Sequence, residues 1–230
     1  MKYKYVLIDV DNTLLDFGYA EKNAHKMASE KFNIPWTDEF YNVYHHINDG
    51  WWKKLERGEC TKEQIVVNRY KEYFAFLGVK DVDPEEFNKT YLSFLGLGKK
   101  TIDGANELVK ALFDGGLKLY IATNGVTKVQ SNRLSGQEFM KYISGVFVSE
   151  DLKATKPQKE FFENAEKSVG VSFKGQSIII GDSLTSDMLG GVNAGIDTLW
   201  FNPKGKENTL GINLTYEVKS LSEIPSLILK

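Results

Sequence analysis

The chain has 230 residues and a formal net charge of −2, a length that suits one large domain or two small ones. The balanced charge and the absence of a basic stripe argue against a nucleic-acid-binding protein, and no apolar run approaches membrane-spanning length. A single cysteine, Cys60, excludes an intramolecular disulfide and a thiolate metal site, and the first apolar run is too short for a signal peptide, so we expect a cytoplasmic protein.

The first predicted element is a short buried strand, Tyr5–Ile8, which leads directly into Asp9-Val10-Asp11-Asn12-Thr13. Side chains two residues apart on an extended segment point the same way, so Asp9 and Asp11 would face one crevice. Ligands bind at the carboxyl ends of strands in an open α/β sheet, and two carboxylates this close need a cation or a shared proton. The pair is therefore a candidate for metal-assisted chemistry with a carboxylate nucleophile. The alternative interpretation is turn and cap chemistry, which Asp, Asn and Thr also favour.

Residues 17–97 carry helical patterns and no convincing strand, which predicts an all-helical insert that begins a few residues after the Asp pair, as a mobile lid would. A capping box at Thr61-x-x-Gln64 begins one helix, and Asp83-Pro84 begins the last. The helix before the capping box is expected to bury an apolar stripe at spacings of three and four: Phe40, Tyr44, Ile47, Trp51 and Leu55. The histidines of the insert are expected at a surface or interface: His25, His45 and His46.

The remainder of the chain alternates strand and helix. Strands are predicted at 117–122, 146–148, 177–180 and 198–201, and helices at 104–113, 126–134, 158–169 and 186–194. Continuous apolar strands separated by helices indicate a parallel sheet covered on both faces. The predicted fold class is thus α/β, with a Rossmann-like core of residues 1–15 and 101–230 and the inserted helical domain at 17–97.

Further strand ends carry polar side chains that one site could use. Thr123 and Asn124 follow the second predicted strand, where a hydroxyl and backbone N–H groups at a helix start would hold an anion. Lys156, followed by a proline at the mouth of a helix, could neutralise a phosphate, and Asp182 and Asp187 follow the most strand-like segment. Each residue alone is explained more simply as a helix cap or a solvated lysine. Their occurrence in this order, after different strands, is much more specific.

These residues, in this order, resemble the four motifs of the haloacid dehalogenase superfamily, and the match covers the whole predicted core. Asp9-Val10-Asp11-Asn12-Thr13 resembles the first motif, Thr123 the second, Lys156 the third, and Gly181-Asp182-Ser183 through Asp187 the fourth. The helical insert resembles the C1 cap of that superfamily. Ile8 stands where the family often has Phe and Asn12 where it often has Gly, but neither difference removes a functional group.

The resemblance implies a Mg2+-dependent phosphomonoester hydrolase that works through an aspartyl-phosphate. Asp9 would be the nucleophile, and Asp11 would protonate the leaving oxygen and then take a proton from water. Mg2+ would be held by Asp9, the backbone carbonyl of Asp11 and Asp182, while Asp187 would support the water shell of the metal or orient Lys156. The groups implied to hold the phosphoryl oxygens are Thr123, the Asn124 amide and Lys156.

An acid at position 11 favours phosphoryl transfer, because the dehalogenases that name the superfamily lack an acid there. The stretch Trp51-Trp52-Lys53-Lys54-Leu55-Glu56-Arg57-Gly58, followed by Arg69, resembles the branch that contains pyrimidine 5′-nucleotidases. Trp51 falls on the apolar stripe and is expected in the core, whereas Trp52 and Arg69 are candidates to contact a base or a second phosphate. We therefore expect a 5′-nucleotidase acting on pyrimidine nucleoside monophosphates.

Several alternatives share the core motifs. They are a phosphatase of sugar phosphates or phosphoglycolate, a phosphomutase, a phosphonatase that uses a cap lysine, and a non-catalytic binding protein. The last would usually have lost an acid or the lysine, and all of these groups are present in this sequence. The expected partner is a small phosphorylated metabolite, with no nucleic acid and no membrane, and the sequence makes no prediction of oligomeric state.

Overall fold

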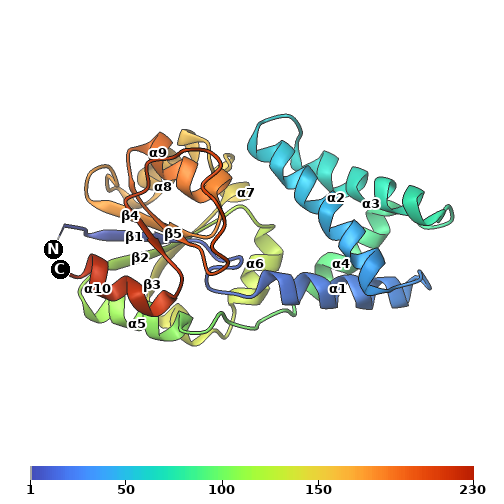
Figure 1. The fold of residues 1–230 in the computed structure, drawn as a ribbon, viewed down its shortest axis with the longest axis horizontal. Coiled ribbons are helices and arrows are strands. Elements are labelled where there is room, and N and C mark those ends of the chain that lie inside the picture. Colours follow the sequence, from blue (N-terminus) through green and yellow to red (C-terminus); the bar gives the residue numbers. More distant parts are fainter. Residues whose placement is uncertain (1) are drawn as a thin grey trace. The chain divides into compact units, whose positions relative to one another are not determined.

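The computed structural model describes residues 2–230, and within them six parallel strands form one sheet (Figure 1). In chain order the strands are β1 (Tyr5–Ile8), β2 (Lys118–Thr123), β3 (Ile143–Val148), β4 (Ser177–Gly181), β5 (Asp197–Phe201) and β6 (Tyr216–Val218). They lie side by side in the order β3-β2-β1-β4-β5-β6, with β1 between β2 and β4. The strand order reverses beside β1, so a crevice is expected at the carboxyl ends of β1 and β4. The predicted parallel α/β class is confirmed.

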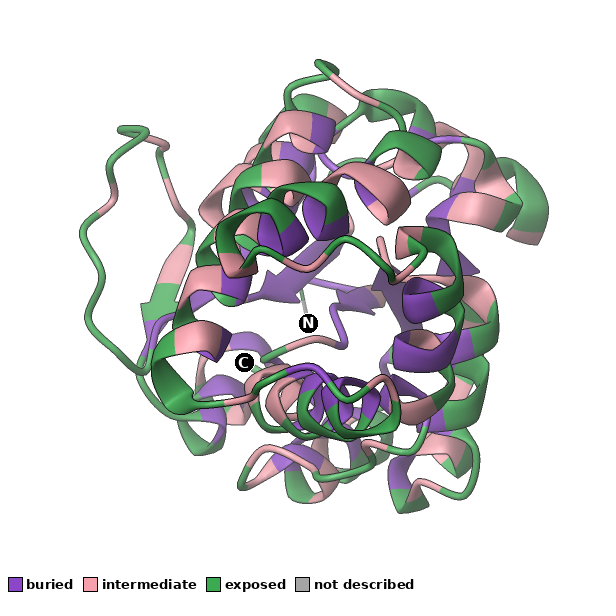
Figure 2. Cartoon of the chain, turned by 90° about the vertical axis from the view of Figure 1, so that its right-hand side faces the viewer, coloured by how far each residue is buried: buried purple, intermediate pink, exposed green. Residues whose placement is uncertain are grey.

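Alternate side chains of each central strand enter two separate hydrophobic cores. Val6 and Ile8 pack in the core that contains α5 (Ala105–Asp114) and α10 (Ile224–Ile228), whereas Leu7 packs in the core that contains α8 (Lys159–Val169). Figure 1 shows these helices on opposite sides of the sheet, and Figure 2 shows buried strands between helices whose outer faces are exposed. Burial on both faces explains why the strands read as continuous apolar runs.

The remaining elements of the α/β part lie between the strands. They are α6 (Thr127–Leu134), η1 (Glu138–Tyr142), α7 (Ser149–Leu152), the π-helical turn η2 (Leu184–Met188), α9 (Leu189–Ala194) and η3 (Leu221–Glu223). The helix predicted at 186–194 is therefore divided between η2 and α9. Strand β3 begins earlier than predicted. The prediction missed its first residues because Ser144 and Gly145 interrupt the apolar pattern. Strand β6 has three residues and is too short for its alternation to be recognised.

The chain divides into two compact units, one comprising the residues up to Asp16 together with Lys99–Lys230, and the other Phe17–Gly98. The second unit consists of α1 (Phe17–Lys31), α2 (Asp38–Glu56), α3 (Lys62–Leu77) and α4 (Pro84–Leu95). Within it α1 packs on α4, and α3 packs on both α2 and α4. The capping box at Thr61 and the Asp83 cap are present as predicted. Among residues 2–230, none of the helices combines the length and apolar character needed to cross a membrane.

The interior of the helical unit contains a polar network. The buried carboxylate of Glu21 accepts hydrogen bonds from Tyr41 Oη at 2.9 Å and Asn48 Nδ2 at 2.7 Å, and pairs with His45 Nδ1 at 2.6 Å. The expected apolar stripe of α2 is only partly present, because Tyr44 and Leu55 are buried as predicted whereas Phe40, Ile47 and Trp51 are partly exposed. The other buried residues of α2 are Tyr41 and Asn48. The surface assignment of His25 is also wrong, because its ring is buried and stacks on Tyr44 with ring centroids 4.1 Å apart.

Candidate active site

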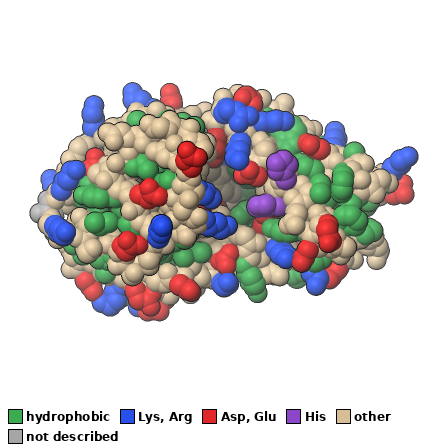
Figure 3. Space-filling model, in the orientation of Figure 1, with side chains coloured by type: hydrophobic (Ala, Val, Ile, Leu, Met, Phe, Trp, Pro, Cys, Tyr) green, Lys and Arg blue, Asp and Glu red, His purple; other side chains and the backbone are tan. Residues whose placement is uncertain are grey.

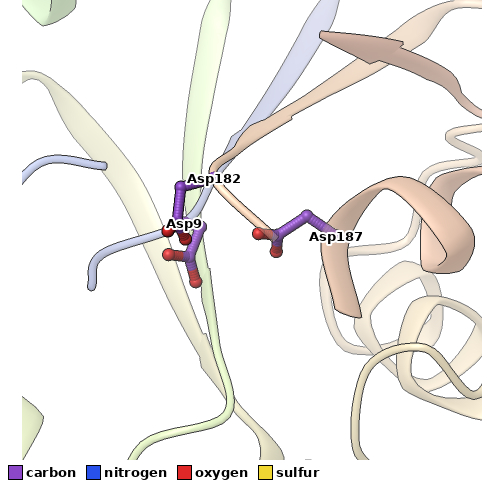
Figure 4. Close-up of side chains that lie close together, drawn as sticks. All are labelled: Asp9, Asp182 and Asp187. Atoms are coloured by element: carbon purple, nitrogen blue, oxygen red, sulfur yellow. The ribbon is translucent and has the colours of Figure 1, made fainter. Parts of the chain in front are cut away.

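Three carboxylates converge at the carboxyl ends of β1 and β4. Asp9 directly follows β1, and its backbone N–H donates to the carbonyl of Ile180 at 2.9 Å, which extends the pairing of β1 with β4. Asp182 directly follows β4, and Asp187 lies in η2. One ligand oxygen from each of the three acids lies within 4.8 Å of the others, and Figure 4 shows Asp187 directed toward the other two. The carboxyl ends of the strands at the strand-order reversal are therefore acidic.

Lys156 connects two of these acids. Its Nζ donates to Asp9 Oδ1 at 2.7 Å, to Asp187 Oδ1 at 2.6 Å and to the carbonyl of Ala122 at 2.6 Å, and its side chain is 1% exposed. Asn124 fixes the backbone of this lysine, because its Oδ1 accepts from the Lys156 N–H at 2.9 Å and its Nδ2 donates to the Lys156 carbonyl at 2.8 Å. The Asn124 side chain thus positions Lys156, which leaves the Asn124 backbone N–H as its candidate anion-binding group.

Burial controls the electrostatics of the site. It raises the pKa of Asp9 well above its usual range, with Lys156 opposing and Asp187 adding to the shift, and it raises the pKa of Asp182 to about 7 with help from Asp187. Burial alone would lower the pKa of Lys156, but the charges of Asp187 and Asp9 outweigh it and raise that pKa. The cluster thus contains three acids and one ammonium group, and its excess of acidic groups fits a divalent cation with oxygen ligands.

Asp11 and Thr123 are connected through helix α6, by residues that sequence reasoning missed. Gln130 Nε2 donates to Thr123 Oγ1 and to Asp11 Oδ2, both at 2.8 Å, and Arg133 Nη1 donates to Asp11 Oδ1. Gln130 and Arg133 are both buried. Their spacing of three on a predicted helix placed them on one face, but nothing in the sequence identified that face as the one beside Asp11. The structure therefore adds two residues to the expected set.

The expected base-contacting residues lie in the helical unit. Trp52 is partly exposed on α2, and neighbouring Trp51 is also partly exposed, with its Nε1 donating to Glu72 Oε2 at 3.1 Å. Arg69 differs from expectation, because it is 4% exposed and its guanidinium donates to the side-chain oxygens of Asn48 and Asn88 inside the unit. The Arg69 guanidinium is therefore held by contacts inside the helical unit, and the expected contact with a base or a second phosphate is not what positions it.

Charged side chains of both signs are interspersed over the face of the molecule seen in Figure 3, in keeping with the net charge of −2. The concentrated charge of this chain is instead the buried cluster of Asp9, Lys156 and Asp187. Buried charges of this kind are expected where ionised groups have a chemical task.

Comparison with known proteins agrees with this geometry. Residues 6–201 match the family model described as haloacid dehalogenase-like hydrolase. The chain is 35% identical over 224 residues to the pyrimidine 5′-nucleotidase PynA of Streptococcus pneumoniae, covering 97% of this chain and 94% of that protein. It is 29% identical over 230 residues to the pyrimidine 5′-nucleotidase YjjG of Escherichia coli, with both chains covered completely.

A solved structure extends the comparison to three dimensions. The crystal structure of the HAD-hydrolase YfnB from Bacillus subtilis aligns with a TM-score of 0.90 at 38% identity, covering 97% of each chain. That structure was determined with bound magnesium and reveals interdomain movement in that protein. The fold, the order of the motifs and these relatives agree with one another.

Proposed function

This chain belongs to the haloacid dehalogenase-like hydrolase family, and from that premise we propose that it is a Mg2+-dependent phosphatase acting on pyrimidine nucleoside 5′-monophosphates. In this proposal the α/β unit is the phosphotransfer core and the helical unit is the cap. The observation that carries the proposal is the contact of Lys156 with both Asp9 and Asp187, beside Asp182. A buried carboxylate held by an ammonium group at a strand end is suited to attack phosphorus while the substrate charge is neutralised.

The proposed reaction has two displacements at phosphorus. An oxygen of Asp9 attacks, the bond from phosphorus to the ester oxygen breaks, and its electron pair leaves with that oxygen, which receives a proton from Asp11. A water molecule then attacks the aspartyl-phosphate, gives a proton to Asp11, and displaces Asp9 with release of inorganic phosphate. Lys156 holds one oxygen of Asp9 at 2.7 Å, which directs the other oxygen toward the substrate.

The residues that would hold Mg2+ are those whose oxygens converge. Asp9 and Asp182 supply carboxylate oxygens, the Asp11 backbone supplies a carbonyl, and Asp187 would support the bound water while it orients Lys156. Once bound, the ion would supply charge neutralisation for the transferring phosphoryl group. Thr123 and the backbone N–H of Asn124 would hold phosphoryl oxygens at the start of α6.

The substrate class rests on the relatives and on α2. PynA and YjjG are both named pyrimidine 5′-nucleotidases and cover nearly the whole chain. Trp52 is the proposed stacking surface for the base, because a partly exposed aromatic side chain can stack on a planar ligand. We propose Arg69 as an internal support of the cap instead of a direct substrate contact, since Asn48 and Asn88 hold its guanidinium.

The test is phosphate release with Mg2+ from pyrimidine and purine 5′-monophosphates, sugar phosphates and phosphoglycolate. Asp9→Asn is expected to abolish release, and mass spectrometry of acid-quenched wild-type enzyme should find the phosphoryl group on Asp9. Asp114→Asn, which changes an exposed acid paired with Lys110, is the matched control and should retain activity. Much faster cleavage of sugar phosphates than of nucleotides would refute the nucleotidase proposal and keep the phosphatase. No release from any ester would refute both.

A further inference from the structure

Helix α6 presents two buried polar side chains to Asp11. Gln130 and Arg133 lie three residues apart on one face of the helix, and they bond opposite oxygens of the Asp11 carboxylate. Arg133 Nη1 also donates to Gln130 Oε1 at 3.1 Å, so the two side chains orient each other. Both are buried, whereas the side chain of Asp11 is 26% exposed. The helix therefore supplies two buried donors to a carboxylate that is itself partly exposed.

The amide of Gln130 has a second partner. Its Nε2 lies 2.8 Å from both Asp11 Oδ2 and Thr123 Oγ1, and an NH2 group has two hydrogens to donate. Thr123 in turn accepts from the Gly125 N–H at 3.1 Å. One amide thus connects the proposed proton-transfer residue to the proposed phosphate-binding hydroxyl. Thr123 would hold the phosphoryl group and Asp11 would protonate its leaving oxygen, so the distance between these two residues determines whether the proton can reach that oxygen.

Gly125 packs closely against the Gln130 amide. A Cβ atom added at Gly125 would lie 2.7 Å from both Cγ and Nε2 of Gln130, closer than non-bonded atoms approach. Any larger residue would displace the amide from its position between Asp11 and Thr123. The glycine therefore permits the packing of Gln130 beside the loop that follows β2.

We propose that Gln130 and Arg133 are positioning residues that hold Asp11 at a set distance from Thr123 for both proton transfers; this inference rests on the proposed phosphatase function. Neither residue needs to touch the substrate. Arg133 orients one oxygen of Asp11, while Gln130 connects the other oxygen to the Thr123 hydroxyl, which would bind a phosphoryl oxygen. Loss of either contact leaves the carboxylate present but misplaced.

The test compares esters that differ in their need for a proton. A nucleoside monophosphate has an alkoxide leaving group that needs the Asp11 proton, whereas p-nitrophenyl phosphate has a leaving group that departs without one. For Arg133→Met and Gln130→Met, kcat/KM for the nucleotide should fall about 100-fold, while kcat/KM for p-nitrophenyl phosphate should stay within about threefold. A purely structural role would lower both values by the same factor.

The second proton transfer gives a separate signal. In the proposed reaction Asp11 also takes a proton from the water that hydrolyses the aspartyl-phosphate. The same variants should therefore form phosphoenzyme from p-nitrophenyl phosphate at a nearly normal rate but hydrolyse it slowly, so that it accumulates. Rapid mixing should then show a burst of nitrophenol equal to the enzyme concentration, followed by a slow steady rate. Arg133→Lys should recover part of the nucleotide activity, since it restores a donor. Lys128→Met is the matched control, because it removes an exposed positive charge from the same helix without touching Asp11.

Gly125→Ala is the variant to use if Arg133→Met does not fold, because it displaces the Gln130 amide without removing a buried charge. It should reproduce the leaving-group selectivity of Gln130→Met. Equal losses on both esters, or unchanged nucleotide activity in every α6 variant with native thermal unfolding, would overturn the positioning role alone. If wild type and Lys128→Met cleave neither ester, the proposed function fails and this inference fails with it.

Discussion

Replacing Lys156 by methionine tests whether its ammonium group stabilises the α/β unit as the geometry indicates. Methionine keeps the length of the buried chain but removes the donor to Asp9, Asp187 and the carbonyl of Ala122. Removal of one partner from a buried charge pair typically costs about 3–5 kcal/mol, because the other charge is left uncompensated. Asp9 can take up a proton to relieve part of this cost, since burial already raises its pKa. We therefore expect a loss of about 3 kcal/mol in the free energy of unfolding.

The assay needs a signal that belongs to the α/β unit. Trp200 on β5 supplies it, because its Nε1 donates to the carbonyl of Asp182 at 3.0 Å and the other tryptophans lie in the helical unit. Urea unfolding of fluorotryptophan-labelled protein, followed by 19F NMR at Trp200, gives the stability of this unit alone. Lys159→Met is the control, since that lysine makes a surface pair with Glu163 and its removal should leave the transition unchanged. A loss in Lys156→Met no larger than in the control would refute the argument.

Three further predictions concern the helical unit and the proposed metal site. Burial, helped by the charge of Arg69, lowers the pKa of His25 to about 3, so between pH 6.5 and 3 the unfolded chain binds a proton that the native ring does not. The free energy of unfolding of the helical unit should therefore fall as the pH decreases through this range, by up to about 1.4 kcal/mol for each pH unit. Urea unfolding at a series of pH values should show a smaller slope in His25→Gln and an unchanged slope in the control His46→Gln, which replaces an exposed histidine. Arg69→Met should destabilise the helical unit by about 2–4 kcal/mol, because it leaves the side-chain oxygens of Asn48 and Asn88 without their donor, whereas Arg57→Met on the surface should not. Urea unfolding followed at the tryptophans of the helical unit measures this loss. Mg2+ should raise the thermal midpoint of wild-type protein and have much less effect on Asp182→Asn, and an equal rise in both would contradict the proposed ligand role.

The sheet could be predicted from the sequence because its physics is simple. Strands buried on both faces must be apolar throughout, so Tyr5–Ile8 and Ser177–Gly181 are recognisable as short apolar runs. The site acids follow these strands directly, and the carboxyl ends of parallel strands meet at one edge. Proximity of Asp9 to Asp182 therefore follows from topology alone, without knowledge of any side-chain contact.

The interior of the helical unit could not be predicted in this way. A search for apolar periodicity assumes that buried positions are apolar, and α2 violates that assumption at Asn48. Hydrogen bonds to Glu21 and from Arg69 satisfy the buried amide, so it is tolerated in the core. His25 is misassigned for the same reason: Trp36 donates to its Nδ1 at 3.2 Å, and aromatic rings surround the neutral imidazole. Buried polar residues are identified by their partners, which the sequence does not reveal.

The α6 residues extend this argument to function. Arg133 is a charged residue on a short helix, and sequence patterns assign such a residue to solvent, yet here it is buried against Asp11. Motifs at strand ends identify the groups that we propose to react, because the fold brings those ends together. The groups that orient them come from helices that pack beside the strands, where the rotation of the helix decides which side chain points inward. If α6 were rotated about its axis by one residue, every motif would be preserved, but Gln130 and Arg133 would no longer donate to Asp11. A chain can therefore contain all the motifs and still hold its proposed acid–base residue in the wrong place.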